Sequence, residues 1–424
     1  MEELLSGDLE ALKRRNKSLV LSIIHQKGPI SRAELTRLTQ LSKVTITRLV
    51  KELLEEEMVR ETGLDVSSGG RRPILLELHP ESGFIIGVEV GLDTICAGIS
   101  NLKGEILMGA KQKNKVSRTR EELVQKIKGI VDELLAKSDI RSDIRPEKIK
   151  GIGLSIPGLI DTEKGVILFG HVVDEKNIPI RDLLRKHFTF PISVDNDANV
   201  GILGERYLGV GRDVDNILYL HIKRYAGDRM SLGCSFVIDG RIYRGASQTS
   251  GELGLRLSGR KEIEGLREEE WVNFKPWEID PPISEEAVQR IVAGSPSLLK
   301  RMVNDNLGAI TVDTVIEAAQ KNDRVSLDVL AHVARKLGVR IAFLVNLLNP
   351  ELVILGGDLV HAGESLLGPL RETVETFAFE VPAQTVTVKF SELRGEFGGC
   401  VGASFLVLSS LFTPAGLSQK QIKI

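Results

Sequence analysis

The sequence predicts a mixed α/β fold: a small N-terminal domain of helices with two strands, followed by a body of two α/β lobes. Helix patterns with capping residues fill about the first 60 residues, strand and helix patterns alternate after them, and that alternation repeats once. The length of 424 residues also exceeds what one hydrophobic core normally organises. We expect an N-terminal domain at 1–80, a first lobe at 81–195 plus 395–424, and a second lobe at 196–394.

The composition is ordinary for a globular protein. Hydrophobic residues make up 42% and charged residues 27% of the chain, which excludes a collagen-like, low-complexity or wholly disordered polypeptide. No apolar run approaches the roughly 20 residues of a membrane helix, and the N-terminus lacks the apolar stretch of a signal peptide. The three cysteines are far apart, so we expect neither a disulfide framework nor a Cys-x-x-Cys motif. These features predict a cytoplasmic protein without a membrane partner.

Basic charge is concentrated near the N-terminus, although the formal charge of the whole chain is −2. Residues 12–51 contain ten lysines and arginines against a single glutamate. Such an excess indicates either a solvated basic face or an anionic partner. Apolar residues at 19–24 have helical spacing, which ends at the Gly-Pro pair 28–29. Ser31 and, three residues later, Glu34 then predict a capping box at the start of a second helix.

A third helix is expected from Lys43 to about Glu56, with Ser42 as its cap after a short turn at 39–41. Its inward-facing residues are expected to be Val44, Leu49, Val50 and Leu53. A helix, a tight turn and a second helix form the geometry that places a recognition helix in the major groove of DNA. We expect DNA contacts from the residues at its start, namely Ser42, Lys43, Thr45, Thr47 and Arg48.

The stretch RETGLDVSSGGRRPILLEL follows as two strand patterns around a glycine-rich tip, which predicts a wing. Arg71 and Arg72 lie at the base of this wing and are expected to contact phosphates or a narrow minor groove. The alternative is a small helical module with a hairpin that docks proteins. DNA binding is favoured because the basic charge, the helix caps and the wing are all expected of a winged-helix DNA-binding domain. This part of the sequence also resembles the winged helix-turn-helix of repressors in the ROK family (repressors, open reading frames, sugar kinases). The segment that carries the resemblance is GPISRAELTRLTQLSKVTITRLVKELLEEEMV.

The body begins with FIIGVEVGLDTICAGISNLKGEILM, which predicts two or three strands, then a helix at 121–137 and the buried-strand pattern IKGIGLSIPGLID. A comparable order recurs in NILYLHI, GCSFVIDGRIYRG, a helix around 327–348 and the strand LVILGG. Two similar units in tandem suggest two lobes with a ligand cleft between them. Residues 258–283 lack periodicity and are expected to form a long excursion.

Four sequence segments in the body resemble motifs of the ROK family in their order and spacing: GIGLSIPGLID, ISVDNDANVGILGERYLG, VIDGRIYRGASQTSGELG and NPELVILGG. Each is weak alone because glycine-rich turns are common, but together they extend the resemblance over nearly the whole chain. The resemblance implies an actin-like sugar-kinase fold for the two lobes, with the C-terminal helices returning to the first lobe.

The resemblance also indicates that the nucleotide side of the kinase site is lost. The kinases begin their first phosphate loop with the Asp of Asp-x-Gly-x-x-Thr, and Glu89 holds that position here. Their second phosphate loop is a dense glycine run, which lets backbone N–H groups approach phosphates. Residues 226–234 carry bulky side chains instead, and Asp228 would repel a phosphate. We expect a structural hairpin there, no ATP-dependent phosphorylation and no catalytic residue.

The sugar side is partly kept. In the kinases the Asp of Asn-Asp-Ala-Asn is the general base toward a sugar hydroxyl. The motif is present at 196–199, and Gly251-Glu252 matches the start of the family's Gly-Glu-x-Gly-His. Without a phosphate donor, Asn196, Asp197 and Glu252 are expected to bind the hydroxyl groups of a carbohydrate effector. The alternative is that Asn196 and Asp197 only cap a helix.

The family's zinc site is not expected here. Leu255 replaces the family's zinc-binding histidine, and the cysteine cluster after it is replaced by GRKEIEGLREEEW. Zinc needs about four nitrogen, sulfur or oxygen ligands held closely, so neither a metal nor another cofactor is predicted. The family's Asn-Leu-x-Trp sugar segment is also missing, which leaves the identity of the sugar open.

Together these features favour a sugar-responsive transcriptional repressor that binds operator DNA through its N-terminal winged helix and an effector in a catalytically silent cleft. Homologous repressors are dimers or tetramers, so we expect a homodimer or homotetramer on a palindromic double-stranded operator, with the oligomerisation surface on the second lobe. Two alternatives stay open. One is a sugar kinase with a fused DNA-binding head, and the other is a scaffold whose head binds proteins.

Overall fold

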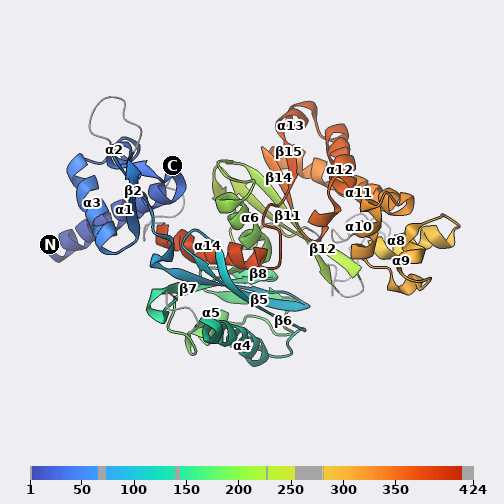
Figure 1. Cartoon of the computed structure of the whole chain (residues 1–424), viewed down its shortest axis with the longest axis horizontal. Coiled ribbons are helices and arrows are strands. Elements are labelled where there is room, and N and C mark those ends of the chain that lie inside the picture. Colours follow the sequence, from blue (N-terminus) through green and yellow to red (C-terminus); the bar gives the residue numbers. More distant parts are fainter. Residues whose placement is uncertain are drawn as a thin grey trace, which may run out of the picture. The chain divides into compact units, whose positions relative to one another are not determined.

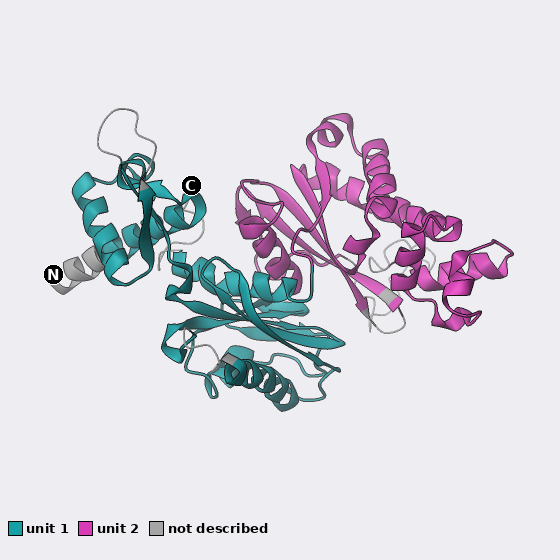
Figure 2. Ribbon diagram, viewed as in Figure 1, with its two compact units in different colours: residues 1–196, 395–424 teal, residues 197–394 magenta. Residues whose placement is uncertain are grey.

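The chain forms two compact units, shown in a computed structural model (Figures 1 and 2): residues 1–196 with 395–424, and residues 197–394. The structure describes residues 2–64, 73–138, 144–225, 228–253, 279 and 281–412. Within these ranges no helix is long and apolar enough to cross a membrane. The units are similar in construction, as their sheets show.

The N-terminal domain is a winged helix-turn-helix. Its elements are α1 (Glu2–Lys27), β1 (Ile30–Ser31), α2 (Arg32–Thr39), α3 (Lys43–Glu55), β2 (Val59–Leu64) and β3 (Ile74–Leu78), with the strands in the order β1-β3-β2. Both predicted cap residues are confirmed: Ser31 Oγ accepts from the Glu34 N–H at 3.2 Å, and Ser42 Oγ accepts from the Thr45 N–H at 3.1 Å. The full capping box predicted for Ser31 and Glu34 is not formed, because the Glu34 carboxylate has another partner. The carboxylate of Glu34 pairs with Arg37, three residues farther along the helix, at 3.0 Å.

The buried stripe of α3 differs from the prediction at one position. Val44 was expected to face inward, but it is 80% exposed, and Ile46 is buried in its place. The buried residues are Ile46, Leu49, Val50 and Leu53, whose spacing of i, i+3, i+4 and i+7 defines one helix face. Val44 lies two residues before this stripe and therefore points about 200° away from Ile46 on the helix.

Unit 1 contains a five-stranded sheet in the order β10-β7-β4-β5-β6. Its elements are η1 (Pro80–Ser82), β4 (Phe84–Val90), β5 (Thr94–Asn101), β6 (Ile106–Lys113), α4 (Arg120–Ser138), η2 (Pro146–Lys148), β7 (Ile149–Ile156), β8 (Gly158–Asp161), β9 (Val166–Gly170), α5 (Ile180–Arg185), β10 (Ile192–Asn196) and α14 (Gly398–Phe412). Helices α4 and α14 cover opposite faces (Figure 1). Helix α14, from the end of the chain, belongs to this unit.

Two glycines let α14 lie directly on this sheet. A Cβ atom on Gly87 would lie 2.0 Å from the Cys400 carbonyl oxygen, and one on Gly153 would lie 1.8 Å from the Ala403 carbonyl oxygen. No side chain fits at either position because these oxygens belong to the helix backbone. The close approach buries Phe405 and Leu408 completely, so residues from the end of the chain complete the core of unit 1.

Unit 2 repeats this sheet in the order β13-β12-β11-β14-β15. Its elements are α6 (Asp197–Leu208), β11 (Ile217–Tyr225), β12 (Arg229–Ile238), β13 (Arg241–Ile242), α8 (Ile283–Val292), α9 (Leu298–Met302), η5 (Leu307–Ala309), α10 (Val312–Gln320), α11 (Arg324–Leu348), β14 (Leu352–Gly357), η6 (Asp358–Ala362), α12 (Glu364–Phe377), α13 (Glu380–Thr385) and β15 (Thr387–Phe390). In both units three antiparallel strands are followed by two parallel ones. The predicted repetition is confirmed.

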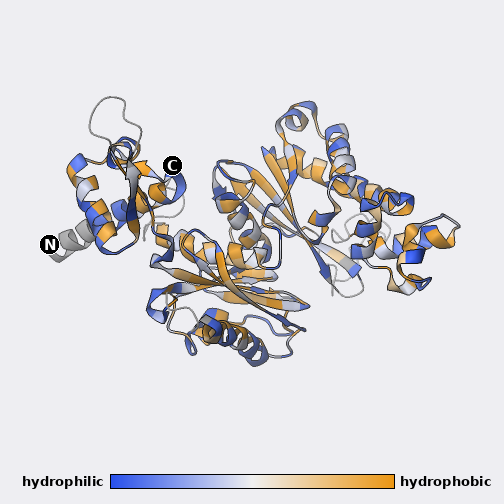
Figure 3. Cartoon of the chain, viewed as in Figure 1, coloured by the Kyte–Doolittle hydropathy of each residue, from blue (hydrophilic) through white to orange (hydrophobic). Residues whose placement is uncertain are grey.

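Strand β11 has two different faces. Leu218, Leu220 and Ile222 join the large core beneath helices α8 to α12, whereas Ile217 and Tyr219 pack with α6. This alternation follows from the two-residue period of a strand, and the interior strands are predominantly apolar (Figure 3). Two consecutive cations near the end of β11 therefore lie on opposite faces of the strand. Lys223 lies on the face that packs against α6, and Arg224 lies on the other face.

Candidate functional site

The start of α3 presents the side chains expected to contact DNA. Ser42, Lys43, Thr47 and Arg48 are exposed, and Thr45 is half-buried. The hydroxyl groups of Ser42 and Thr45 lie 2.9 Å apart within the cap, and Thr47 Oγ1 donates to the Lys43 carbonyl at 2.8 Å. Each hydroxyl keeps a lone pair or its hydrogen for a base edge or a phosphate. These residues therefore form one polar surface at the helix start.

Ion pairs neutralise part of the basic excess of the N-terminal domain. Lys13 contacts Glu52 at 2.9 Å, Lys17 pairs with Glu56, and Arg32 contacts Glu61 at 2.9 Å. Within the described part of the chain, no carboxylate lies within ion-pair distance of Lys43 or Arg48. Two cations without an ion pair among the described residues thus lie at the polar start of α3, where an anionic ligand can meet them.

Two further features of this domain concern DNA contact. Arg71 and Arg72 lie outside the described residues, although β2 and β3, which flank them, form the expected antiparallel hairpin. Val44 is the residue that the sequence pattern missed. It is an exposed apolar side chain between Lys43 and Thr45, and such a side chain can contact the methyl group of thymine in the major groove.

Asp197 begins α6 directly after the last residue of β10. It is buried, with 9% of its surface exposed. Its Oδ1 accepts from the Ala198 N–H at 3.0 Å, and its Oδ2 lies 3.5 Å from the Nζ of Lys223 on β11. The carboxylate therefore accepts from the next backbone N–H at the helix start, and it also has an ion-pair partner that was not predicted.

Lys223 and His221 set the charge state of Asp197. Burial alone would raise the pKa of Asp197, but the nearby Lys223 and His221, with hydrogen bonds from Lys223 and the Ala198 N–H, bring that pKa below its usual value. Asp197 is therefore a carboxylate at neutral pH and a weakened base. Lys223 lies on the same strand face as Tyr219 and His221, and the His221 ring nitrogen Nδ1 lies 3.0 Å from the Tyr219 hydroxyl.

Glu252 lies near Asp197, so the structure brings together two of the three predicted effector-binding residues. Gly251 before it has a φ of +98°, and a Cβ there would lie 2.0 Å from the Cys234 carbonyl oxygen of β12. Glu252 as a residue is exposed, but partial burial of its carboxyl group and the charge of Asp197 raise its pKa. Ionised carboxylates accept hydrogen bonds from the hydroxyl groups of a ligand.

Asn196, the third predicted residue, belongs to unit 1. Its amide donates to the Gly158 carbonyl at 2.8 Å, and its backbone N–H donates to the side chain of Asp195 at 2.7 Å. The side chain thus links β10 to β8. Leu255 and the segment that replaces the family's cysteine cluster lie outside the described residues, and within the described ones no three His, Cys, Asp or Glu side chains gather as metal ligands.

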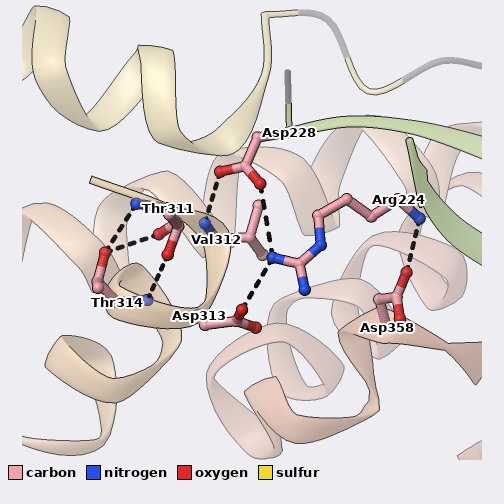
Figure 4. Close-up of polar contacts among 7 residues, drawn as sticks. All are labelled: Arg224, Asp228, Thr311, Val312, Asp313, Thr314 and Asp358. Carbon is pink, nitrogen blue, oxygen red and sulfur yellow. Dashed lines mark hydrogen bonds and ion pairs between the residues drawn. The ribbon is translucent and has the colours of Figure 1, made fainter. Parts of the chain in front are cut away.

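Ion pairs and hydrogen bonds connect the hairpin between β11 and β12 to the neighbouring helices (Figure 4). Arg224 Nη1 contacts Asp313 at 2.9 Å and Asp228 at 3.5 Å, and the Arg224 N–H donates to Asp358 Oδ2 at 2.6 Å. Asp228 Oδ2 accepts from the Val312 N–H at 2.9 Å, at the start of α10. The stretch that resembles the kinases' second phosphate loop therefore carries one carboxylate, Asp228, which accepts at the start of a helix and pairs with an arginine.

The position of the first phosphate loop is also occupied by a carboxylate. A Cβ atom on Gly399 would lie 2.0 Å from Oε2 of Glu89, so this carboxylate lies against the first turn of α14. The N-terminus of a helix favours an anion. Here the chain supplies that anion itself, at the position where the kinases have the first residue of their loop.

Comparison with known proteins places the chain in a family. The model described as the ROK family matches residues 85–410. The chain belongs to the ROK family. Residues 15–62 also match the model described as the MarR family, within the winged-helix domain. The predicted resemblance is confirmed in both parts of the chain.

Relatives of this ROK protein include the xylose repressor of Caldicellulosiruptor bescii, 32% identical over 96% of this chain and 98% of that protein. A solved ROK family transcriptional regulator, described as a homologue of the E. coli MLC protein, has a TM-score of 0.76 and 25% identity over 95% of this chain and 97% of its own. A ROK glucokinase from Streptomyces griseus has a TM-score of 0.61 and 24% identity over 76% of this chain and 99% of its own. The glucokinase shows that the body has the sugar-kinase fold.

Proposed function

We propose that this ROK protein is a sugar-responsive transcriptional repressor without kinase activity. The start of α3 reads operator DNA, with Ser42, Lys43, Thr45, Thr47 and Arg48 as contacts and Arg71 and Arg72 on the wing. Asp197 and Glu252 bind the hydroxyl groups of a carbohydrate, while the amide of Asn196 donates to the Gly158 carbonyl. The names of the xylose repressor and of the solved transcriptional regulator, which share nearly its whole length, support this function.

One observation weighs most against the kinase alternative. Both stretches that resemble phosphate loops hold carboxylates already engaged within the chain: Asp228 with the Val312 N–H and Arg224, and Glu89 at the first turn of α14. A triphosphate placed beside either would meet like charge, which costs free energy at short range. In addition, the pKa of Asp197 is lowered beside Lys223, and a weaker base is less suited to deprotonating a sugar hydroxyl.

The protein is cytoplasmic, acts as a homodimer or homotetramer on a palindromic operator, and uses neither a metal nor another cofactor. Its effector is a neutral carbohydrate or polyol, because carboxylates pair well with hydroxyl donors. The effector alters operator affinity only insofar as it binds one conformation of the protein more tightly than another.

The proposal is tested with the full chain. Operator sequences are first selected from random double-stranded DNA, and fluorescence anisotropy then measures their affinity at several salt concentrations with a panel of sugars. We expect salt-dependent, sequence-selective binding that one sugar class alters. Asp197→Asn should raise the sugar concentration needed for that change, and Glu252→Ala should raise it further, with operator affinity in the absence of sugar unchanged. Asp213→Asn, an exposed position in the same unit, is the matched control.

Three results would contradict this assignment. If Asp197→Asn responded to the sugar like the wild type, the effector site would lie elsewhere. If ATP and the sugar together produced a phosphosugar and Asp197→Asn abolished it, the chain would be a kinase. If no DNA were selected, the N-terminal domain would instead be a protein-docking module.

A further inference from the structure

The chain passes between the two units twice. It enters unit 2 at Asp197 and leaves it after Arg394, from where residues 395–424 return to unit 1. Asp197 is the first residue of α6, and residues 391–394 follow directly after strand β15. The two crossing points are far apart in the sequence, so a change at one reaches the other only through contacts inside unit 2.

Glu205 of α6 connects these two crossing points. Its side chain is completely buried, and its Oε1 accepts hydrogen bonds from the Leu393 N–H at 2.9 Å and from the Ser391 hydroxyl. Its Oε2 accepts from the Val210 N–H at 3.0 Å, in the turn after α6. Among the described residues, every hydrogen bond between α6 and residues 391–394 ends on this carboxylate.

A buried carboxylate is a costly way to make this connection, because an ion loses its hydration inside a protein. In the part of the chain that the structure describes, no lysine, arginine or histidine lies within ion-pair distance of Glu205. Gly209 leaves room for the carboxylate, since a Cβ atom there would lie 2.0 Å from Glu205 Oε2. Apolar side chains often stabilise a core as well as buried ions do. The carboxylate therefore indicates a role beyond stability.

Residues 391–394 form one segment that ends at a glycine. Arg394 Nε donates to the Ser391 carbonyl at 2.8 Å, and its guanidinium lies 6.0 Å from the centre of the Phe390 ring. The next residue, Gly395, has a φ of +119°, and nothing lies within 4 Å of the position that a Cβ atom would take. Glycine adopts such a conformation readily, and a few loop residues of this kind absorb the backbone changes of a hinge.

We propose that Glu205 is a positioning residue that transmits effector binding from Asp197 to the second crossing point. Asp197 and Glu205 are eight residues apart on α6, which is about 12 Å of helix. Because a helix moves as a rigid element, a shift of α6 on binding the carbohydrate carries residues 391–394 with it, and Gly395 absorbs the change. The inference rests on the proposed effector site, and it adds the residue through which that site acts on the rest of the chain.

Ser391→Ala tests this role in the full chain, because it removes one donor to Glu205. Neutral aldopentoses and aldohexoses are the probes; calorimetry measures their binding without DNA, and fluorescence anisotropy measures operator affinity with and without them. The variant should bind the sugar as the wild type does, because Asp197 and Glu252 are unchanged. The factor by which saturating sugar changes operator affinity, about 5 to 150 between coupled sites, should fall to about twofold or less. Glu205→Gln should have the same effect.

Ser326→Ala is the matched control. Ser326 is also buried, and its hydroxyl donates to the buried Asp323 at 2.8 Å at the start of α11. This variant should lower the melting temperature about as much as Ser391→Ala, yet keep the wild-type response to sugar. Hydrogen exchange gives a second readout. Sugar should change the exchange of residues 391–398 in the wild type and in Ser326→Ala, but not in Ser391→Ala or Glu205→Gln.

Two results would overturn the proposal. One is a wild-type response to sugar in both Ser391→Ala and Glu205→Gln, and if Glu205→Gln does not fold, Ser391→Ala alone decides. The other is loss of sugar binding itself in a folded variant, since Glu205 would then shape the effector site and not transmit from it. A wild type whose operator affinity no aldose alters would instead contradict the proposed function, and this inference would fall with it.

Discussion

The Nζ atom of Lys223 lies 3.5 Å from Oδ2 of Asp197. This ion pair places a cation next to the carboxylate that matches the general base of the ROK sugar kinases. It keeps Asp197 ionised in a buried position and occupies one of the two oxygens that a sugar hydroxyl could approach. The pair therefore gives this carboxylate a structural partner in a chain that we propose does not phosphorylate sugars.

The first prediction concerns the pH dependence of stability. The pKa of Asp197 is lowered in the folded state, so its contribution to stability is present above the unfolded value of about 3.9 and is lost as the pH falls through the folded value. Lys223→Met leaves a buried carboxylate without its cation and should cost about 2 kcal/mol at neutral pH. Urea unfolding at a series of pH values should show this cost shrinking toward about pH 3 as Asp197 becomes protonated.

The control for this prediction is Asp197→Asn. In that background Lys223→Met should have the same effect at all these pH values, because the titrating partner is gone. If Lys223→Met instead cost the same free energy at every pH in the wild-type background, the two charges would not be coupled.

The second prediction concerns operator recognition. Replacing Lys43, Thr45 or Thr47 by Ala should cost about 1–3 kcal/mol of operator binding and relax specificity at one base pair. Arg48→Ala should weaken binding to all DNA and reduce the slope of log affinity against log salt by about one. Replacing Arg71 and Arg72 together should reduce that slope further. Operator affinity that is indifferent to every one of these changes would exclude α3 as the recognition helix.

The third prediction concerns Val44, which is 80% exposed. Val44→Ala should leave the free energy of unfolding unchanged within about 0.5 kcal/mol, while it weakens operator binding by about 1 kcal/mol. Operators in which single thymines are replaced by uracil lack only the methyl group. At one position, the uracil operator and Val44→Ala should have non-additive effects, as expected for partners in contact. Additivity at every thymine would remove Val44 from the interface.

The fourth prediction compares two carboxylates that contact Arg224. Asp228 has a φ of +60° and caps α10, so Asp228→Gly keeps the backbone conformation and removes the cap. We expect a loss of about 1–2 kcal/mol in thermal or urea unfolding. Asp313 contacts the same guanidinium but its side chain is 69% exposed, so Asp313→Ala should cost less than about 0.5 kcal/mol. Equal losses would mean that the ion pair, and not the cap, stabilises the hairpin.

Features that depend on a few neighbouring residues were predictable from the sequence. Ser31 and Ser42 were recognised as caps because the hydrogen bond of a cap spans only three residues. The strands of both sheets followed from the same kind of local pattern, and the repetition followed from their order. Val44 was assigned to the wrong side of α3 because an apolar residue near a helix end fits the stripe only if the helix phase is known. Ile46, at the correct phase, was overlooked.

Contacts between distant segments were not predictable. Lys223 reaches Asp197 only because β11 and α6 pack together, and the sequence shows neither this packing nor which side of β11 faces α6. A signal did exist: Tyr219, His221 and Lys223 alternate along a strand and would share a face. Asp228 was predicted to repel a phosphate, but its hydrogen bond at the start of α10 could not be predicted, because that helix begins 84 residues later along the chain.

The dependence of unit 1 on α14 has a consequence for synthesis of the protein on the ribosome. Strands β4 and β7 emerge early, but the backbone that covers Gly87 and Gly153 is made only when residues 398–412 are translated. Unit 2 is continuous from 197 to 394, so all of it is available to fold before the first lobe can close its core. Until then one face of the first sheet stays open to water and to chaperones. A nascent chain arrested before α14 would therefore present a folded second lobe and an aggregation-prone first one.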